Sequence, residues 1–223
     1  MTDAHRAGLV EDIERGVATA IRPEPWQTDT CIGNWHYDRR VFEQHRYKTP
    51  VQVIQMLADI VSKNGNLMLN IPVRGDGTID DDEIAFLEGL SQWMPINGEA
   101  IFSTRPWRVY GEGPSVTGRV QAGRFGGARD VRAYTAQDIR FTAKDDALYA
   151  IFMDWPGTPA TISSIRPDDG TVQKVELLGR DGPLQFTQDA AGLKVNLPAE
   201  RPGDYACSLK ISGIKSQQGR QVG

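Results

Sequence analysis

Residues 49 to 107 constrain the fold most, because helix, strand and helix signals follow one another there without a break. Thr49 is a good N-cap, Pro50 falls at the first helical position, and Gln52 stands three residues after the cap. Apolar residues then recur at helical spacing: Val53, Ile54, Leu57, Ile60 and Val61. Asn64-Gly65 tolerates a left-handed conformation and predicts the end of this helix.

A second helix is predicted after Asp80 and Glu83, which repeat the same capping pattern. Its apolar face is expected to be Ile84, Leu87, Leu90 and Met94, and Asn97-Gly98 ends it. Between the two helices, residues 67 to 71 are nearly all apolar. Such a run is typical of a strand that is covered on both faces, so the segment indicates an α/β fold with a parallel sheet.

The chain changes character near residue 108. Glycines and a proline mark a linker, and short runs with β-type composition follow at 138–142, 147–153, 171–178, 193–197 and 205–211. This pattern predicts an antiparallel β-sandwich. We therefore expect an α/β unit over residues 1–107 and a linker with an all-β domain over 108–223, which ends in a polar tail from Ser212.

Composition excludes several classes of function. A net charge of -4 gives no reason to expect nucleic acid as a partner. Membrane association is not expected, because no apolar run approaches about 18 residues and the N-terminus lacks a signal-peptide pattern; the compartment stays open. His5, His36 and His45 lack companions at metal-ligand spacing, so neither a metal nor a cofactor is expected. Cys31 and Cys207 are interpreted as reduced core residues rather than a bridge.

Several short motifs carry a family resemblance. In chain order they are ERG at 14–16, PWQTDT at 25–30, GNWHY at 33–37, NGNLMLNIP at 64–72, DGTI at 76–79, NGEAI at 97–101, TRPW at 104–107, DIRFT at 138–142, LYA at 148–150 and WP at 155–156. The order and content of these motifs resemble the distal part of the α-L-fucosidases of glycoside hydrolase family 29.

The resemblance implies a fold and an activity. Members of this family have a barrel of eight strands and eight helices, followed by a β-sandwich, and such a barrel needs roughly 250 residues. We therefore expect the last third of that barrel plus the complete C-terminal domain of an exo-acting, retaining α-L-fucosidase that acts on fucosylated glycans. The nucleophile is an aspartate of a mid-barrel strand. Asp3 and Asp12 lack that context, so no nucleophile is assigned and the chain alone is expected to be inactive.

Glu14 is the candidate general acid/base. Retaining glycosidases use two carboxyl groups about 5 Å apart, one as nucleophile and one as acid and then base. The resemblance points to Glu14, about a dozen residues before the Pro-Trp-Gln motif. The alternative is a surface carboxylate paired with Arg15. Glu24, Asp29 and Glu43 are rivals, although Asp29 is better explained as a loop-capping group.

Aromatic residues near Glu14 suggest a sugar-binding surface. Trp26, Trp35 and Tyr37 come close together in the chain, and an aromatic face packs well on the apolar face of a sugar. Trp35 is the first choice, with core packing as the alternative. Asn70, at the end of the apolar strand, is expected either to hydrogen-bond site residues or to order the loop backbone. Arg105 and Trp107 are assigned to the domain junction.

A different function class also remains open, namely a non-catalytic carbohydrate-binding or structural module. That class requires an exposed aromatic platform, for which only Trp155 is available in the second domain. A partial barrel would also leave Leu67, Leu69 and Ile71 without partners, so association into an oligomer is expected.

Overall fold

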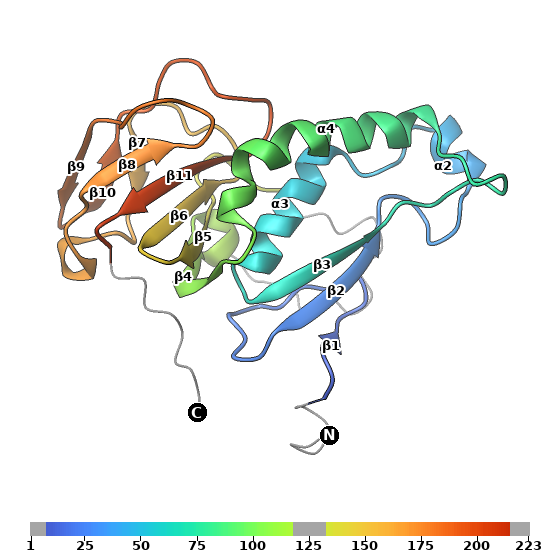
Figure 1. Cartoon of the computed structure of the whole chain (residues 1–223), viewed down its shortest axis with the longest axis horizontal. Coiled ribbons are helices and arrows are strands. Elements are labelled where there is room, and N and C mark those ends of the chain that lie inside the picture. Colours follow the sequence, from blue (N-terminus) through green and yellow to red (C-terminus); the bar gives the residue numbers. More distant parts are fainter. Residues whose placement is uncertain (1–7, 118–132, 215–223) are drawn as a thin grey trace.

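The computed structural model describes residues 8–117 and 133–214. Its first part holds a parallel sheet whose strands are ordered β1 (Glu11–Asp12), β2 (Trp26–Cys31) and β3 (Gly65–Asn70). Helices α3 (Pro50–Val61) and α4 (Asp81–Asn97) pack on this sheet, and a short helix α2 (Arg39–Glu43) follows β2. Figure 1 shows α3 lying between the parallel sheet and a second, antiparallel sheet.

Both predicted helix starts are confirmed. At α3 the Thr49 side chain accepts from the Gln52 backbone, and the Gln52 side chain accepts from the Thr49 backbone. Asp80 and Glu83 make the same reciprocal pair at α4. Asn64, just beyond α3, has the left-handed backbone that its position requires (φ 71°). Local capping chemistry therefore sets where both helices begin.

The buried face of α4 differs from the prediction. Ile84 and Leu87 are 42% and 37% exposed, whereas Phe86, Gly89 and Trp93 are buried. Gly89 is the physical reason, because a Cβ there would lie 2.6 Å from Pro50 Cγ. The glycine lets α4 approach the start of α3 closely, which turns the neighbouring aromatic residues toward the core.

Strand β3 is covered on one face only, so the prediction of a strand buried on both faces is wrong here. Leu67, Leu69 and Ile71 are half-buried and pack on the cluster formed by Val53 and Phe86. Met68, on the opposite face, is 53% exposed. Leu67, Leu69 and Ile71, which were expected to lack partners in a partial barrel, therefore pack on the helices of this chain. The exposed apolar side chain of β3 is Met68.

Two antiparallel sheets make up the second part. One has the strand order β4-β5-β6-β11-β8 and the other β7-β10-β9. Their bounds are β4 (Arg105–Glu112), β5 (Ile139–Lys144), β6 (Ala147–Phe152), β7 (Ala160–Ile162), β8 (Lys174–Leu177), β9 (Phe186–Asp189), β10 (Gly192–Val195) and β11 (Cys207–Ser212). One hydrophobic core includes residues from both sheets, among them Phe141, Leu148, Ile162 and Leu193. The five predicted strands correspond to β5, β6, β8, β10 and β11.

Strand β4 crosses the boundary expected at residue 107. It pairs with β5, and Trp107 is buried in the core of the second part, 5.2 Å from Phe141 between ring centroids. Trp107 therefore holds the junction structurally, as its position in the sequence suggested. Most of the predicted glycine linker and polar tail lies outside the described residues.

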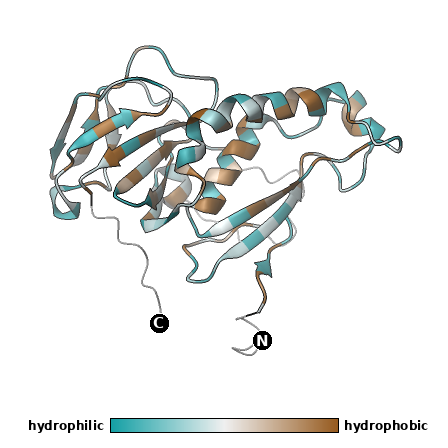
Figure 2. Ribbon diagram, in the orientation of Figure 1, coloured by the Kyte–Doolittle hydropathy of each residue, from teal (hydrophilic) through white to brown (hydrophobic). Residues whose placement is uncertain are grey.

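The two parts share an apolar interface. Ile54 and Ala58 of α3, with Trp93 of α4, pack against Tyr149 and Ile151 of β6. Figure 2 shows the hydrophobic residues that run along α3 and the strands beside it. Backbone carbonyls of the second part also accept from the helices: Gln55 Nε2 donates to Met153 O at 2.8 Å, and Trp93 Nε1 donates to Ala206 O at 2.6 Å. The interface combines packing with directional bonds.

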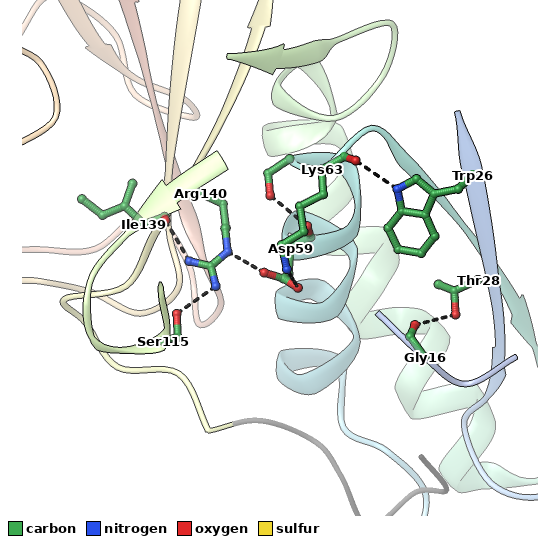
Figure 3. A network of polar contacts seen from close by, with 9 residues as sticks. Gly16, Trp26, Thr28, Asp59, Lys63, Ser115, Ile139 and Arg140 are labelled. Carbon is green, nitrogen blue, oxygen red and sulfur yellow. Dashed lines mark hydrogen bonds and ion pairs between the residues drawn. The ribbon is translucent and has the colours of Figure 1, made fainter. Parts of the chain in front are cut away.

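A buried ion network crosses the same interface (Figure 3). Asp59 of α3 accepts from Lys63 Nζ at 2.7 Å and from Arg140 Nε, on β5, at 2.6 Å. Arg140 Nη2 also donates to Ser115 Oγ at 2.8 Å. Burial disfavours the charged carboxylate, but the two cations outweigh it and hold the pKa of Asp59 below its ordinary value. One carboxylate thus ties α3 to the second part.

Both cysteines are free and buried, in line with their interpretation as core residues. Within the described residues, no helix combines the length and the apolar character needed to cross a membrane.

Candidate active site

The carboxyl ends of β1, β2 and β3 meet at one edge of the parallel sheet, and the loops that follow them carry most of the predicted site residues. Glu14 lies on the turn after β1, Trp35 and Tyr37 lie in the loop after β2, and Asn70 is the last residue of β3. In parallel α/β folds this edge is where substrates bind. The topology therefore brings four of the five predicted residues to one edge.

Glu14 is exposed and free of a local ion pair with Arg15. The pairing of β1 with β2 continues past the strand, because Ile13 N donates to Gln27 O and Arg15 N donates to Asp29 O, both at 2.9 Å. This register puts Glu14 opposite Asp29. The Arg15 guanidinium turns away to Trp35 and Cys31, so the alternative of a Glu14–Arg15 surface pair is not what the structure shows.

The pKa of Asp29 is raised by its surroundings at this edge. Burial raises the pKa of Asp29, and the carboxylates of Asp12 and Glu14 raise it further. Its Oδ1 is buried and has no hydrogen-bond partner among the described residues. Backbone N–H groups of Asp29 and Arg15 act on the same carboxylate and oppose the rise in its pKa, so Asp29 is a half-buried carboxyl group in contact with the local backbone.

The loop after β2 is fixed by its neighbours. Asn70 Nδ2 donates to Trp35 O at 3.2 Å, so Asn70 orders the loop backbone, one of the two roles expected for it. The Arg15 guanidinium lies 4.7 Å from the Trp35 ring centroid. Arg74 Nε donates to Tyr37 OH at 3.4 Å from the loop after β3. Both aromatic rings are half-buried and held by a cation.

An open pocket of about 560 Å³ lies along this loop. Its lining residues are Arg15, Asn34, Trp35, His36, Tyr37, Asp38, Arg39 and Arg40. Two aromatic side chains and several hydrogen-bonding groups are the composition that suits a sugar. Sequence reasoning missed the role of Arg15 and Arg74 here. The signal in the sequence is Arg15 of the ERG motif, for which the sequence alone suggests only a pairing with Glu14.

Trp26 lies apart from this pocket, and its interpretation as a sugar-contacting residue is corrected by its position. It is the first residue of β2, at the opposite end of the strand, and is 1% exposed. Its ring packs on Ile60, and Nε1 donates to Lys63 O at 3.0 Å. A Cβ on Gly65 would lie 2.5 Å from the ring. Trp26 is a packing residue beneath α3.

The rival carboxylates are placed less favourably than Glu14. Glu24 lies near the start of β2, at the end of the strand opposite the pocket. Glu43 is on α2 and pairs with Arg39 Nε at 2.8 Å. His36 lines the pocket, His45 Nδ1 lies 2.8 Å from Asp82 Oδ2, and His5 lies outside the described residues. No group of three potential metal ligands occurs within residues 8–117 and 133–214.

The chain matches two family models along most of its length. The model described as "Alpha-L-fucosidase" matches residues 1–99, and the one described as "Alpha-L-fucosidase C-terminal domain" matches residues 133–212. The tissue α-L-fucosidase of Rattus norvegicus is 30% identical over 196 residues, covering 85% of this chain and 37% of the relative. The human plasma α-L-fucosidase is 31% identical over 213 residues, covering 87% and 39%. The chain thus spans about two fifths of the length of these relatives.

Solved structures show the same relationship. The α-fucosidase of Thermotoga maritima in complex with fucose superposes with a TM-score of 0.67 at 25% identity, covering 85% of this chain and 40% of that one. The α-L-fucosidase isoenzyme 1 of Paenibacillus thiaminolyticus gives 0.67 at 23%, covering 92% and 45%. Fold and sequence agree in both parts of the chain. The chain belongs to the α-L-fucosidases, glycoside hydrolase family 29.

Proposed function

We propose that this chain is the distal part of an exo-acting, retaining α-L-fucosidase that removes terminal fucose from glycans. In this proposal β1 to β3, with α3 and α4, are the last part of an eight-stranded barrel, and the two antiparallel sheets are its C-terminal β-sandwich. The barrel part comprises approximately residues 1–107, and the linker with the β-sandwich comprises residues 108–223. The observation that carries the proposal is the exposed Glu14 at the carboxyl edge of a parallel sheet, next in the chain to Arg15, which lines the pocket of Trp35 and Tyr37.

Each residue has a stated role in the mechanism. Glu14 protonates the leaving oxygen and then deprotonates the water that releases the fucose. Trp35 and Tyr37 contact the apolar face of a sugar, and Asn70 fixes the Trp35 loop through the carbonyl of that residue. The nucleophilic aspartate comes from the part of the catalytic domain that precedes this chain in the full-length enzyme. The chain alone therefore hydrolyses no aryl α-L-fucoside, because the acid/base cannot replace the covalent step.

A purely carbohydrate-binding module has less support. Trp155, the aromatic residue that the second part offered for a platform, packs against the core that both antiparallel sheets share. The aromatic pocket of this chain is lined by the loop after β2 and by Arg15, which follows Glu14 directly in the chain. That combination favours catalysis over binding alone.

The test uses the full-length enzyme with Glu14→Gln. Loss of the general acid should slow a natural fucosylated glycan by about 10²–10⁴-fold, and an aryl fucoside with a good leaving group much less, because that group departs without protonation. Glu43→Gln is the matched control and should behave as the unmodified enzyme. Activity of Glu14→Gln within about twofold on the natural glycan would require another acid/base and overturn the assignment.

A further inference from the structure

Three guanidinium groups line the pocket beside Trp35, and one of them has no counter-charge. Arg39 Nε pairs with Glu43 Oε1 at 2.8 Å, and Arg40 Nη2 pairs with Asp38 Oδ2 at 2.9 Å. Within the described part of the chain, no carboxylate lies at ion-pair distance from Arg15. The charge of Arg15 is therefore the uncompensated one in the pocket.

Contacts with Trp35 and Cys31 hold the Arg15 guanidinium in place, but they leave part of its hydrogen-bonding capacity unused. Its guanidinium stacks 4.7 Å from the Trp35 ring centroid, and Nη2 donates to Cys31 Sγ at 3.3 Å, a weak acceptor. Its Nε is buried and finds no acceptor among the described residues. A buried guanidinium donor without an acceptor is costly, so the arrangement favours an acceptor that enters from the pocket.

A second cation, Lys48, contacts the same cysteine as Arg15. Lys48 is 7% exposed, and its Nζ donates to Cys31 O at 2.6 Å. Burial lowers the pKa of Lys48; the neighbouring Cys31 opposes this shift, and the Arg15 charge adds to it. The acidic groups near this edge are Glu14 and Asp29 on the sheet and Asp38 in the pocket. None of these three forms an ion pair with Arg15 or Lys48 in the described structure, so two positive charges converge near Cys31.

We propose that this pocket binds an anionic substituent, a sulfate ester or a carboxylate, on the sugar that carries the fucosyl residue. The proposal rests on the proposed function, because a general acid faces the leaving-group oxygen and Arg15 is the chain neighbour of Glu14. The planar guanidinium fork matches two oxygens of a carboxylate or a sulfate. A substrate with such a group would supply the acceptor that Arg15 lacks.

The first test uses the 223-residue chain itself. It is titrated with glucose 6-sulfate, glucuronate and glucose at low ionic strength, and the Trp35 indole signal is followed by NMR. Glucose 6-sulfate, glucuronate or both should shift the Trp35 signal, whereas glucose should not. Comparing the shifts caused by glucose 6-sulfate and by glucuronate shows whether the pocket prefers a sulfate or a carboxylate. Binding should weaken in about 0.5 M salt, because the interaction is ionic.

Variants assign the effect to Arg15. Arg15→Gln should weaken binding of the anion by about tenfold, whereas Arg15→Lys keeps the charge and should lose less. Arg201→Gln, an exposed residue paired with Asp204, is the control and should bind as the unmodified chain does. No response of Trp35 to either anion, or a response that survives both Arg15→Gln and high salt, would overturn the proposal.

The second test uses the full-length enzyme with a fucosylated disaccharide that carries, or lacks, the anionic group on its second sugar. The ratio of kcat/KM for the charged and neutral substrates should be about ten, and Arg15→Gln should bring it close to one. An equal ratio in both enzymes would refute the anion site while leaving the fucosidase assignment intact. Absence of any fucosidase activity would instead refute the proposed function.

Discussion

Asp59 shows how one residue couples the two parts of the molecule. Its carboxylate serves two buried cations, Lys63 and Arg140, which come from different parts. We predict that Asp59→Ala lowers the free energy of unfolding by about 3–5 kcal/mol, because it removes the carboxylate and leaves the cations buried. Urea unfolding followed by tryptophan fluorescence measures this. Asp204→Ala, which breaks the exposed pair with Arg201, is the control. Its free energy of unfolding should equal that of the unmodified chain within experimental error.

The same residue predicts a pH dependence. The folded-state pKa of Asp59 is lowered, so its stabilising contribution is present above the unfolded value of about 3.9 and is lost as the pH falls through the folded pKa. The urea midpoint of unfolding, measured from about pH 5 down to about pH 2, should therefore fall as the pH drops below about 3.9. In Asp59→Asn that part of the drop should disappear. An unchanged acid profile in Asp59→Asn would contradict this account.

At the scale of elements, helix starts follow from local chemistry. The Thr49 side chain accepts from the Gln52 backbone at 3.3 Å as part of a reciprocal cap. Thr49→Ala should destabilise the chain by about 1 kcal/mol, because an orphan backbone donor of α3 loses its acceptor. Thermal unfolding followed by circular dichroism tests this, with Thr171→Ala, an exposed residue outside any helix or strand, as control. Equal melting temperatures for both variants would rule out a stabilising cap.

The helices and strands that depend on contacts between distant parts of the sequence could not be predicted fully. Caps and β-type runs predicted α3, α4 and five strands, because these signals are local. Half of the buried face of α4 was predicted correctly, because Leu90 and Met94 pack on the core. Ile84 and Leu87 are exposed instead, because Gly89 lies against Pro50, which is far away in the sequence. Strand β4 was missed, because its glycine and proline resemble a linker until the pairing with β5 is known.

The candidate site divides in the same way. The resemblance suggested Glu14, aromatic chemistry suggested Trp35 and Tyr37, and the strand end suggested Asn70; the parallel topology brings all four to one edge. Trp26 was wrongly predicted to contact the sugar. It is the first residue of β2 and therefore lies at the end of the strand opposite the pocket, and this could be known only once the strand bounds were known. Arg15 was underestimated, because its contacts with Trp35 and Cys31 span loops.

At the scale of the whole molecule, the shared interface predicts cooperative unfolding. Helices α3 and α4 pack on the outer face of the five-stranded sheet, and the buried ion network crosses the same boundary. Differential scanning calorimetry should therefore give a single transition for the chain, with a calorimetric enthalpy equal to the van't Hoff value. Two separate transitions would show that the parts unfold independently, and that the interface contributes little to stability.

The central claim is that Glu14 is the acid/base of a retaining fucosidase, and the product formed by a full-length Glu14→Ala enzyme with azide tests it most directly. Azide needs no general base, so it should attack the fucosyl-enzyme intermediate and restore turnover of an activated aryl α-L-fucoside. Two successive inversions at the anomeric carbon give net retention. NMR of the product should therefore show α-L-fucosyl azide. A β-configured azide, or no rescue at all, would contradict the role assigned to Glu14.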